Sequence, residues 1–321
     1  MIVLERCEVR LRSFDPEPYA LNPDRVSLAA EIACLLEVSA AKPGNVTPFA
    51  GFSDTRYLDF LVSAAILGVV LRKAERTTTG SLVLEAVRET ARLVGRNTNL
   101  GIALLFAPLA KAALLGGRRP LRSRLSAVLA SLTPTDGQKI YEAIRLAAPG
   151  GLGEAARFDV RETHSRVPLL EAMRSAMERD SIAREYATDF EITFTIGAPA
   201  LTRCVKESSD PEASIIQTYL TLLSRIPDSL IARKCGGQEA RKISSQAGQI
   251  LGLGGAFTQT GRRKLARWDR ALRKGGNRLN PGTTADLTAA ALFAVMLQEG
   301  VQFLLKNPGK SSTGRQLRGG R

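Results

Sequence analysis

The chain has 321 residues, of which 44% are hydrophobic and 24% charged, a composition typical of folded globular proteins. Lysine and arginine total 45 against 31 aspartate and glutamate residues, and the resulting net charge of +14 favours an anionic partner. Only 5% of the residues are aromatic, which leaves little material for the stacking platforms of single-strand nucleic-acid binders. We therefore expect phosphorylated small molecules as ligands, and nucleic acid is disfavoured.

Several other classes of protein are excluded by simple features. The four cysteines are far apart and form no CxxC pair, which argues against a zinc site or a disulfide framework and fits a reducing cytoplasm. The first twelve residues lack the apolar region of a signal peptide, and the longest apolar stretch, 58–71, is shorter than the ~18 residues of a membrane span. The single histidine, His164, excludes mechanisms that need a histidine pair, and its polar loop indicates a surface role. We expect a cytoplasmic protein without a membrane partner.

Apolar residues recur at helical spacing through most of the chain, with no alternation of strands and helices. Pro108 should kink or divide one of these helices, and segment 190–196 fits a helix end as well as a strand. The pattern predicts an all-α fold: an N-terminal extension (1–26), one multi-helix domain (27–305) with polar loops between its helices, and a basic disordered tail (306–321). The expected helices are 27–41, 57–74, 81–94, 102–115, 125–132, 135–147, 169–190, 201–206, 213–224, 230–252, 262–274 and 284–305.

Two short motifs of nucleotide-binding proteins fail on their context. Gly309-Lys310-Ser311 lacks both the upstream glycine and the strand of a P-loop. Residues 151–156 match GxGxxA, but a helix and not a strand precedes them. A doubly wound nucleotide-binding fold is therefore not expected.

Polar loops rich in glycine and asparagine interrupt the apolar helices and carry the candidate binding residues. Helix starts of this kind bind phosphate because free N–H groups and the helix dipole converge there, although each loop also fits a turn with ordinary capping. Thr283 and Asp286 have the spacing of a capping box at such a start. The candidate phosphate- and substrate-binding residues in these loops are Lys42, Gly44, Asn45, Asn97, Thr98, Asn99, Gly101, Asn280, Gly282 and Thr283.

A further candidate cluster is Asp180, Arg184 and Glu185, which lie within one predicted helical turn. Two acidic groups and one basic group at this spacing fit either a site for Mg²⁺ and phosphate or simple pairing with one another. The residues alone leave both alternatives open.

Six motifs, taken in order, carry a resemblance to one family. They are residues 37–45 (EVSAAKPGN), 60–65 (FLVSAA), Asn97-Thr98 with Gly101, 151–155 (GLGEA), 228–233 (DSLIAR) and 280–287 (NPGTTADL). Each motif is weak alone, but together they span about residues 27–303. In this order they resemble the triphosphoribosyl-dephospho-CoA synthase family, whose members are all-helical and join ATP to dephospho-CoA with release of adenine.

The resemblance implies a transferase that attaches a phosphorylated ribose, through its C1 atom, to an acceptor hydroxyl. ATP would be a substrate, and Mg²⁺ would be held by carboxylates, with Asp180 and Asp228 the first choices for the metal. The catalytic candidates are Asp59, Glu154, Asp180, Asp228 and Asp286, and Lys42, Arg184 and Arg233 would neutralise phosphates.

Two departures from the family pattern leave the substrates open. Asn99-Leu100 stands where the family usually has His-Lys, and Gly51-Phe52-Ser53 where it has Gly-Ala-His. A divergent branch could use phosphoribosyl pyrophosphate as donor and a ribosyl-pterin acceptor of tetrahydromethanopterin biosynthesis. A second alternative, from another class, is a non-catalytic basic protein that binds polyanions. The sequence does not indicate the oligomeric state.

Overall fold

The computed structural model describes residues 21–154, 157–162 and 168–305, and this part of the chain is all helical, as predicted. Its only β-type pairings are two isolated bridges, 47 to 50 and 52 to 55. His164, the extension to residue 20 and the tail from residue 306 lie outside the described residues. The α-helices are α1 (Pro23–Ser39), α2 (Tyr57–Leu71), α3 (Thr79–Val94), α4 (Leu100–Leu114), α5 (Leu121–Ala130), α6 (Pro134–Ala147), α7 (Leu169–Ala176), α8 (Ser181–Ala187), α9 (Ala198–Glu207), α10 (Pro211–Arg225), α11 (Ser229–Cys235), α12 (Gly237–Gly252), α13 (Gln259–Arg273) and α14 (Gly282–Glu299). Three short helical segments are η1 (Thr193–Gly197), η2 (Gly255–Phe257) and η3 (Val301–Leu305).

Local capping decides where several helices begin and why two predicted helices are divided. α1 starts four residues earlier than predicted because the Asn22 side chain accepts a hydrogen bond from the Arg25 N–H (2.8 Å), ahead of a proline at the first helical position. The predicted helix 169–190 is divided because Asp180 caps a new helix, α8. The predicted helix 230–252 breaks at Gly236, whose φ of 89° is open mainly to glycine.

Pro108 lies inside α4, which nevertheless continues as one helix from Leu100 to Leu114. A proline has no N–H, so the carbonyl of Leu104, four residues earlier, loses its partner within the helix. The buried hydroxyl of Tyr186 donates to this carbonyl instead (2.7 Å). A contact from α8 thus compensates for the missing helical hydrogen bond and ties α8 to α4.

The segment 190–196, which fitted either a helix end or a strand, is helical from residue 191 onward. Its first N–H groups, those of Ile192 and Thr193, donate to the carboxylate of Glu185 (2.9 and 2.8 Å), which is fully buried. Burial raises the pKa of Glu185 to about 7, although these hydrogen bonds act in the opposite direction. Glu185 therefore has a structural role, as the cap of the helical turn that leads into η1.

The raised pKa of Glu185 should make the stability of the protein depend on pH. A carboxyl group with a raised folded-state pKa contributes stability that is fully present below its unfolded pKa of ~4.3 and is lost as the pH rises through its folded value. For Glu185 we expect a loss on the order of 3 kcal/mol between pH 5 and 8.5. Urea unfolding at the two pH values should show a smaller decrease for Glu185→Gln than for the wild type. Glu191→Gln, at a half-exposed position, is the matched control and should keep the wild-type decrease.

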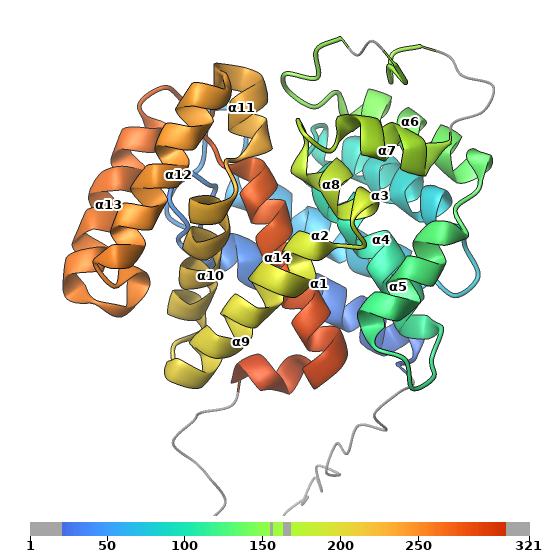
Figure 1. The fold of residues 1–321 in the computed structure, drawn as a ribbon, viewed down its shortest axis with the longest axis horizontal. Helices are drawn as coiled ribbons and strands as arrows, with labels where there is room; N and C mark the ends of the chain where they lie inside the picture. Colours follow the sequence, from blue (N-terminus) through green and yellow to red (C-terminus); the bar gives the residue numbers. More distant parts are fainter. Residues whose placement is uncertain (1–20, 155–156, 163–167, 306–321) are drawn as a thin grey trace, which may run out of the picture.

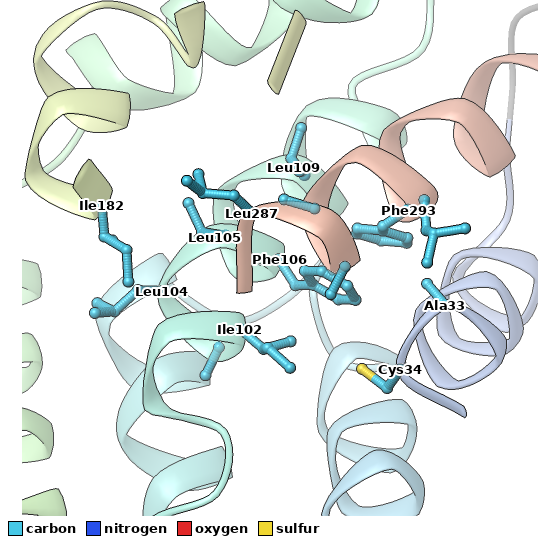
Figure 2. Packing of buried hydrophobic residues seen from close by; sticks show 14 of the residues in the cluster. Ala33, Cys34, Ile102, Leu104, Leu105, Phe106, Leu109, Ile182, Leu287 and Phe293 are labelled. Atoms are coloured by element: carbon cyan, nitrogen blue, oxygen red, sulfur yellow. The ribbon is translucent and has the colours of Figure 1, made fainter. Parts of the chain in front are cut away.

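Helix α14 is the centre of the core. Figure 1 shows α14 between α9 to α13 on one side and α3 to α8 on the other. Thirteen of its residues are buried, and it contacts α1, α4, α9 and α10. Phe293 of α14 stacks on Phe106 of α4, with ring centroids 4.3 Å apart, and Figure 2 shows these rings among Leu105, Leu109 and Ala33. The core therefore fixes the starts of α4 and α14 relative to each other.

The apolar stretch predicted as a buried core helix is α2, which packs against α1 and α3. It buries residues such as Leu67 and Leu71 but exposes Leu58 and Val69 on its outer side. Within the described ranges, no helix combines the length and the apolar character that crossing a membrane requires.

Candidate active site

A cavity of about 1020 Å³ lies where the starts of α4, α8 and α14 meet α6, α7 and the last turn of α11. Such a volume is at the upper end of small-molecule sites and is large enough for a nucleotide. Part of its wall is apolar and comes from α6, α7 and the loop between them, including Ile144, Phe158 and Met173. Twelve of the predicted site residues line it: Asn45, Asn97, Thr98, Asn99, Gly101, Glu154, Asp180, Arg233, Asn280, Gly282, Thr283 and Asp286.

Asp286 is a carboxylate in this wall to which no described residue donates a hydrogen bond. It lies in the first turns of α14, and its side chain packs against Gly101 so closely that a Cβ atom on Gly101 would be 2.0 Å from Asp286 Oδ2. Burial, then the nearby carboxylates of Glu37 and Asp228, raise its pKa well above the ordinary range. A carboxyl group of this kind is suited to accept a proton in a reaction.

The predicted capping box of Thr283 and Asp286 is wrong. α14 begins at Gly282, so Thr283 already lies inside the helix. The carboxylate that satisfies the helix start is Asp228, whose Oδ2 accepts hydrogen bonds from the backbone N–H (2.7 Å) and hydroxyl (2.8 Å) of Thr284. Since the cap comes from another helix, the Asp286 side chain is left to face the cavity.

Glu37 is a site residue that did not appear among the sequence candidates, although it lies in the first family-like motif. Its carboxylate forms a buried ion pair with Lys42 (3.0 Å), and burial raises its pKa while Lys42 acts in the opposite direction. The Lys42 ammonium also donates to the backbone carbonyls of Glu37 and Ala40 and lies off the cavity wall. Lys42 therefore holds Glu37 in place at the wall of the cavity.

Asp180 and Arg233 form the main ion pair in the cavity wall. Oδ1 of Asp180 caps α8 through the N–H groups of Ile182 (2.9 Å) and Ala183 (3.1 Å), and Oδ2 accepts from Arg233. Gly151, with φ of 72°, brings its loop against α11: a Cβ there would lie 2.9 Å from that of Arg233. The loop 148–154 and the basic end of α11 thus form one part of the cavity.

The cavity residues that the sequence did not single out include four basic or amide side chains: Arg96, Arg179, Lys234 and Asn277. Lys234 donates to the carbonyl of Asn277 (3.3 Å), and burial lowers its pKa. They escaped prediction because surface-like charges acquire a shared environment only through the fold. Glu154 lies at the outer rim, 88% exposed, and pairs with Arg161 at 3.5 Å.

Five predicted residues lie off the cavity wall, and most have structural partners. Lys42 and Asp228 are two of them; Asp228 is 2% exposed, caps α11 through Ile231 (3.0 Å), and has its pKa raised by burial. Asp59 accepts from the backbone of Arg56 at the start of α2 (2.9 Å), and the N–H of Gly44 donates to Asp269 (2.8 Å).

Arg184 pairs with Glu191 at 2.9 Å, so the cluster with Asp180 and Glu185 forms neither of the two expected arrangements.

The donor set does not fit a Mg²⁺ ion held by the predicted pair. Both carboxylate oxygens of Asp228 and both of Asp180 already accept hydrogen bonds. Over the described ranges, no group of three or more histidine, cysteine or acidic side chains is placed to hold a metal.

An all-helical domain around a large cavity, with a half-buried carboxyl group of raised pKa in its wall, has the site of an enzyme. The family model of ATP:dephospho-CoA triphosphoribosyl transferases (CitG) matches residues 23–303. The chain belongs to this family, and it is a transferase.

Individual relatives agree with this assignment. A probable 2-(5''-triphosphoribosyl)-3'-dephosphocoenzyme-A synthase of Malonomonas rubra is 27% identical over 289 residues, which cover 83% of this chain and 85% of the relative. A protein of the same name from Pseudomonas fluorescens Pf-5 is 26% identical over 243 residues, 64% of this chain and 82% of that one. The fold is similar to the crystal structure of a protein assigned as triphosphoribosyl-dephospho-CoA synthase from Archaeoglobus fulgidus, with a TM-score of 0.58, 29% identity, and coverage of 74% of this chain and 98% of that chain.

Proposed function

We propose that the chain transfers the triphosphoribosyl group of ATP to a hydroxyl group of dephospho-CoA, with Asp286 as the general base. The observation that carries the proposal is the Asp286 carboxylate, which faces the cavity without a hydrogen-bond partner among the described residues and has a raised pKa. The acceptor hydroxyl would lose its proton to Asp286 and form a new bond to C1 of the ribose. The bond from C1 to adenine would break, and adenine would leave with the electron pair and take up a proton.

The remaining charged groups of the cavity fit this reaction. Positive charge develops at C1 as adenine leaves, and the carboxyl groups of Asp286 and Glu37, which are negative when ionised, lie close to each other in the wall. Arg233, Lys234 and the glycine-rich loop 148–154 offer cations and close backbone approach for the triphosphate. Mg²⁺ would then enter with the triphosphate, since magnesium in such sites usually keeps phosphate and water ligands.

The test is an incubation of the purified protein with dephospho-CoA and MgATP, with free adenine as the readout. We expect adenine release that depends on dephospho-CoA and is retained when residues 306–321 are deleted. A parallel incubation with phosphoribosyl pyrophosphate, read as pyrophosphate release, covers the divergent donor. Turnover with phosphoribosyl pyrophosphate alone would overturn ATP as donor. No turnover with either, together with salt-sensitive polyanion binding that disappears with the tail, would favour the non-catalytic alternative.

A further inference from the structure

Two buried asparagine side chains in the cavity wall each have a carbonyl oxygen without a partner among the described residues. Asn45 and Asn99 are 5% and 4% exposed, and both line the cavity wall. The Nδ2 group of Asn45 donates to Asn280 Oδ1 (2.6 Å), and that of Asn99 donates to Thr90 Oγ1 (2.9 Å). Each amide is therefore held by its nitrogen, while its Oδ1 atom has no hydrogen-bond partner among the residues that the structure describes. Buried polar atoms of this kind are costly unless a ligand satisfies them.

The groups around these oxygens narrow the choice of ligand. Asp286 and Glu37, in the same wall, are also hydrogen-bond acceptors and carry negative charge when ionised. A phosphate oxygen also accepts hydrogen bonds, so it cannot pair with the Oδ1 atom of Asn45 or Asn99. A group with O–H or N–H donors is complementary to this part of the wall.

The position of Asn99 favours a sugar hydroxyl over other donors. Asn99 precedes α4 by one residue, and Asp286 packs against Gly101 in the first turn of the same helix. If Asp286 acts next to C1 of the donor ribose, as the proposed function requires, the nearest donor on the substrate is the hydroxyl at the adjacent carbon, the 2′-hydroxyl. Asn45, in the loop that joins the start of α14 through Asn280, lies in the same wall and is available to the neighbouring hydroxyl.

We propose that the Oδ1 atoms of Asn99 and Asn45 bind the ribose hydroxyls of the donor nucleotide, with Asn99 on the 2′-hydroxyl. This inference rests on the proposed function. It assigns to the two asparagines a role in distinguishing ribonucleotides from deoxyribonucleotides. It also fixes the orientation of the substrate, because the ribose lies over the acceptor groups and the triphosphate extends toward Arg233 and Lys234.

The inference is tested by calorimetric binding of ATP, 2′-deoxy-ATP and 3′-deoxy-ATP without acceptor, so that no turnover interferes. The wild type should bind ATP about 3- to 30-fold more tightly than 2′-deoxy-ATP, the loss expected for one buried hydrogen bond. Asn99→Leu should weaken ATP binding to the level of 2′-deoxy-ATP, and Asn99→Asp, which keeps an acceptor at this position, should retain the preference. Asn45→Leu should weaken ATP binding to the level of 3′-deoxy-ATP, and Asn45→Asp should retain the preference for ATP over 3′-deoxy-ATP.

Two control ligands show which part of the nucleotide Asn99 contacts. Inorganic triphosphate has no ribose, so its affinity should be the same in the wild type and in Asn99→Leu, which also reports on an intact fold. Inosine triphosphate lacks the adenine amino group. The inference would be overturned if Asn99→Leu removed a preference for ATP over inosine triphosphate but did not change the preference for ATP over the deoxyribonucleotides. Equal binding of ATP and both deoxyribonucleotides would overturn it alone, whereas a failure of ATP to bind would overturn the proposed function as well.

Discussion

Asp286→Asn should lower the rate of adenine release by about 10²- to 10⁴-fold, the usual contribution of a general base. The substitution keeps the shape of the side chain but removes the proton acceptor that faces the cavity. The kcat/KM of the wild type should rise with pH through the raised pKa of Asp286, and this limb should be absent from the residual activity of the variant. The measurement is a pH series of adenine release at fixed MgATP and dephospho-CoA.

The same variant should be more stable than the wild type near neutral pH. Because the folded-state pKa of Asp286 is raised, its stabilising contribution is present below the unfolded pKa of ~3.9 and is lost as the pH rises through the folded value. Asn carries no charge and avoids that loss. Asp228→Asn is the matched control at the same helix junction: it removes an acceptor from a carboxylate that caps α11 and α14, and it should lower stability. Full activity of the Asp286→Asn protein would contradict the assignment of Asp286 as the general base.

Gly101→Ala should have an activity loss similar in size to that of Asp286→Asn. Alanine is better than glycine in a helix by about 1 kcal/mol, so helix propensity alone predicts a more stable protein. The new Cβ atom would, however, lie 2.0 Å from Oδ2 and 2.5 Å from Cγ of Asp286, and 2.9 Å from Cδ1 of Ile182. The carboxylate must therefore leave its position, and we expect at least a ~10²-fold loss of adenine release.

A double-mutant cycle tests whether this effect passes through Asp286. In the wild-type background Gly101→Ala should lower the free energy of unfolding, measured in urea, whereas in an Asp286→Ala background most of this cost should disappear with the clashing side chain. Gly252→Ala, in the last turn of α12 with open space around its Cα, is the neutral control. Equal decreases in unfolding free energy in the two backgrounds would show that the new Cβ atom clashes with a group other than Asp286.

Much of the fold follows from local sequence. The helical spacing predicted an all-α chain, and most of the helices lie within a few residues of their expected ranges. The errors occurred where a side chain or a glycine divides a predicted helix, as at Asp180 and Gly236. Other arrangements are completed by a distant group: the Tyr186 hydroxyl donates to the Leu104 carbonyl, which Pro108 leaves without a helical partner.

In the candidate site too, some features followed from local sequence and others depended on distant groups. The polar loops predicted as binding elements do meet at one cavity, since the starts of α4 and α14 are brought together by their packing at Phe106 and Phe293. Which charged residue has which role did not follow from position in a motif. Lys42, expected to bind phosphate, lies in a buried ion pair with Glu37, and it is Glu37 that lines the cavity.

The sequence by itself determined the helical class, the loops that carry the site and the family, because apolar periodicity, caps and motif order are properties of neighbouring residues. Only the tertiary structure decided the state of each carboxylate. Asp228 and Asp286 are both aspartates near the same helix start, yet the first is satisfied by Thr284, 56 positions away, and the second packs against Gly101 with no hydrogen-bond donor among the described residues. The reason is physical: hydrogen-bond partners, burial and nearby charge set the chemistry of an acidic group, and these come from segments that only the folded chain brings together.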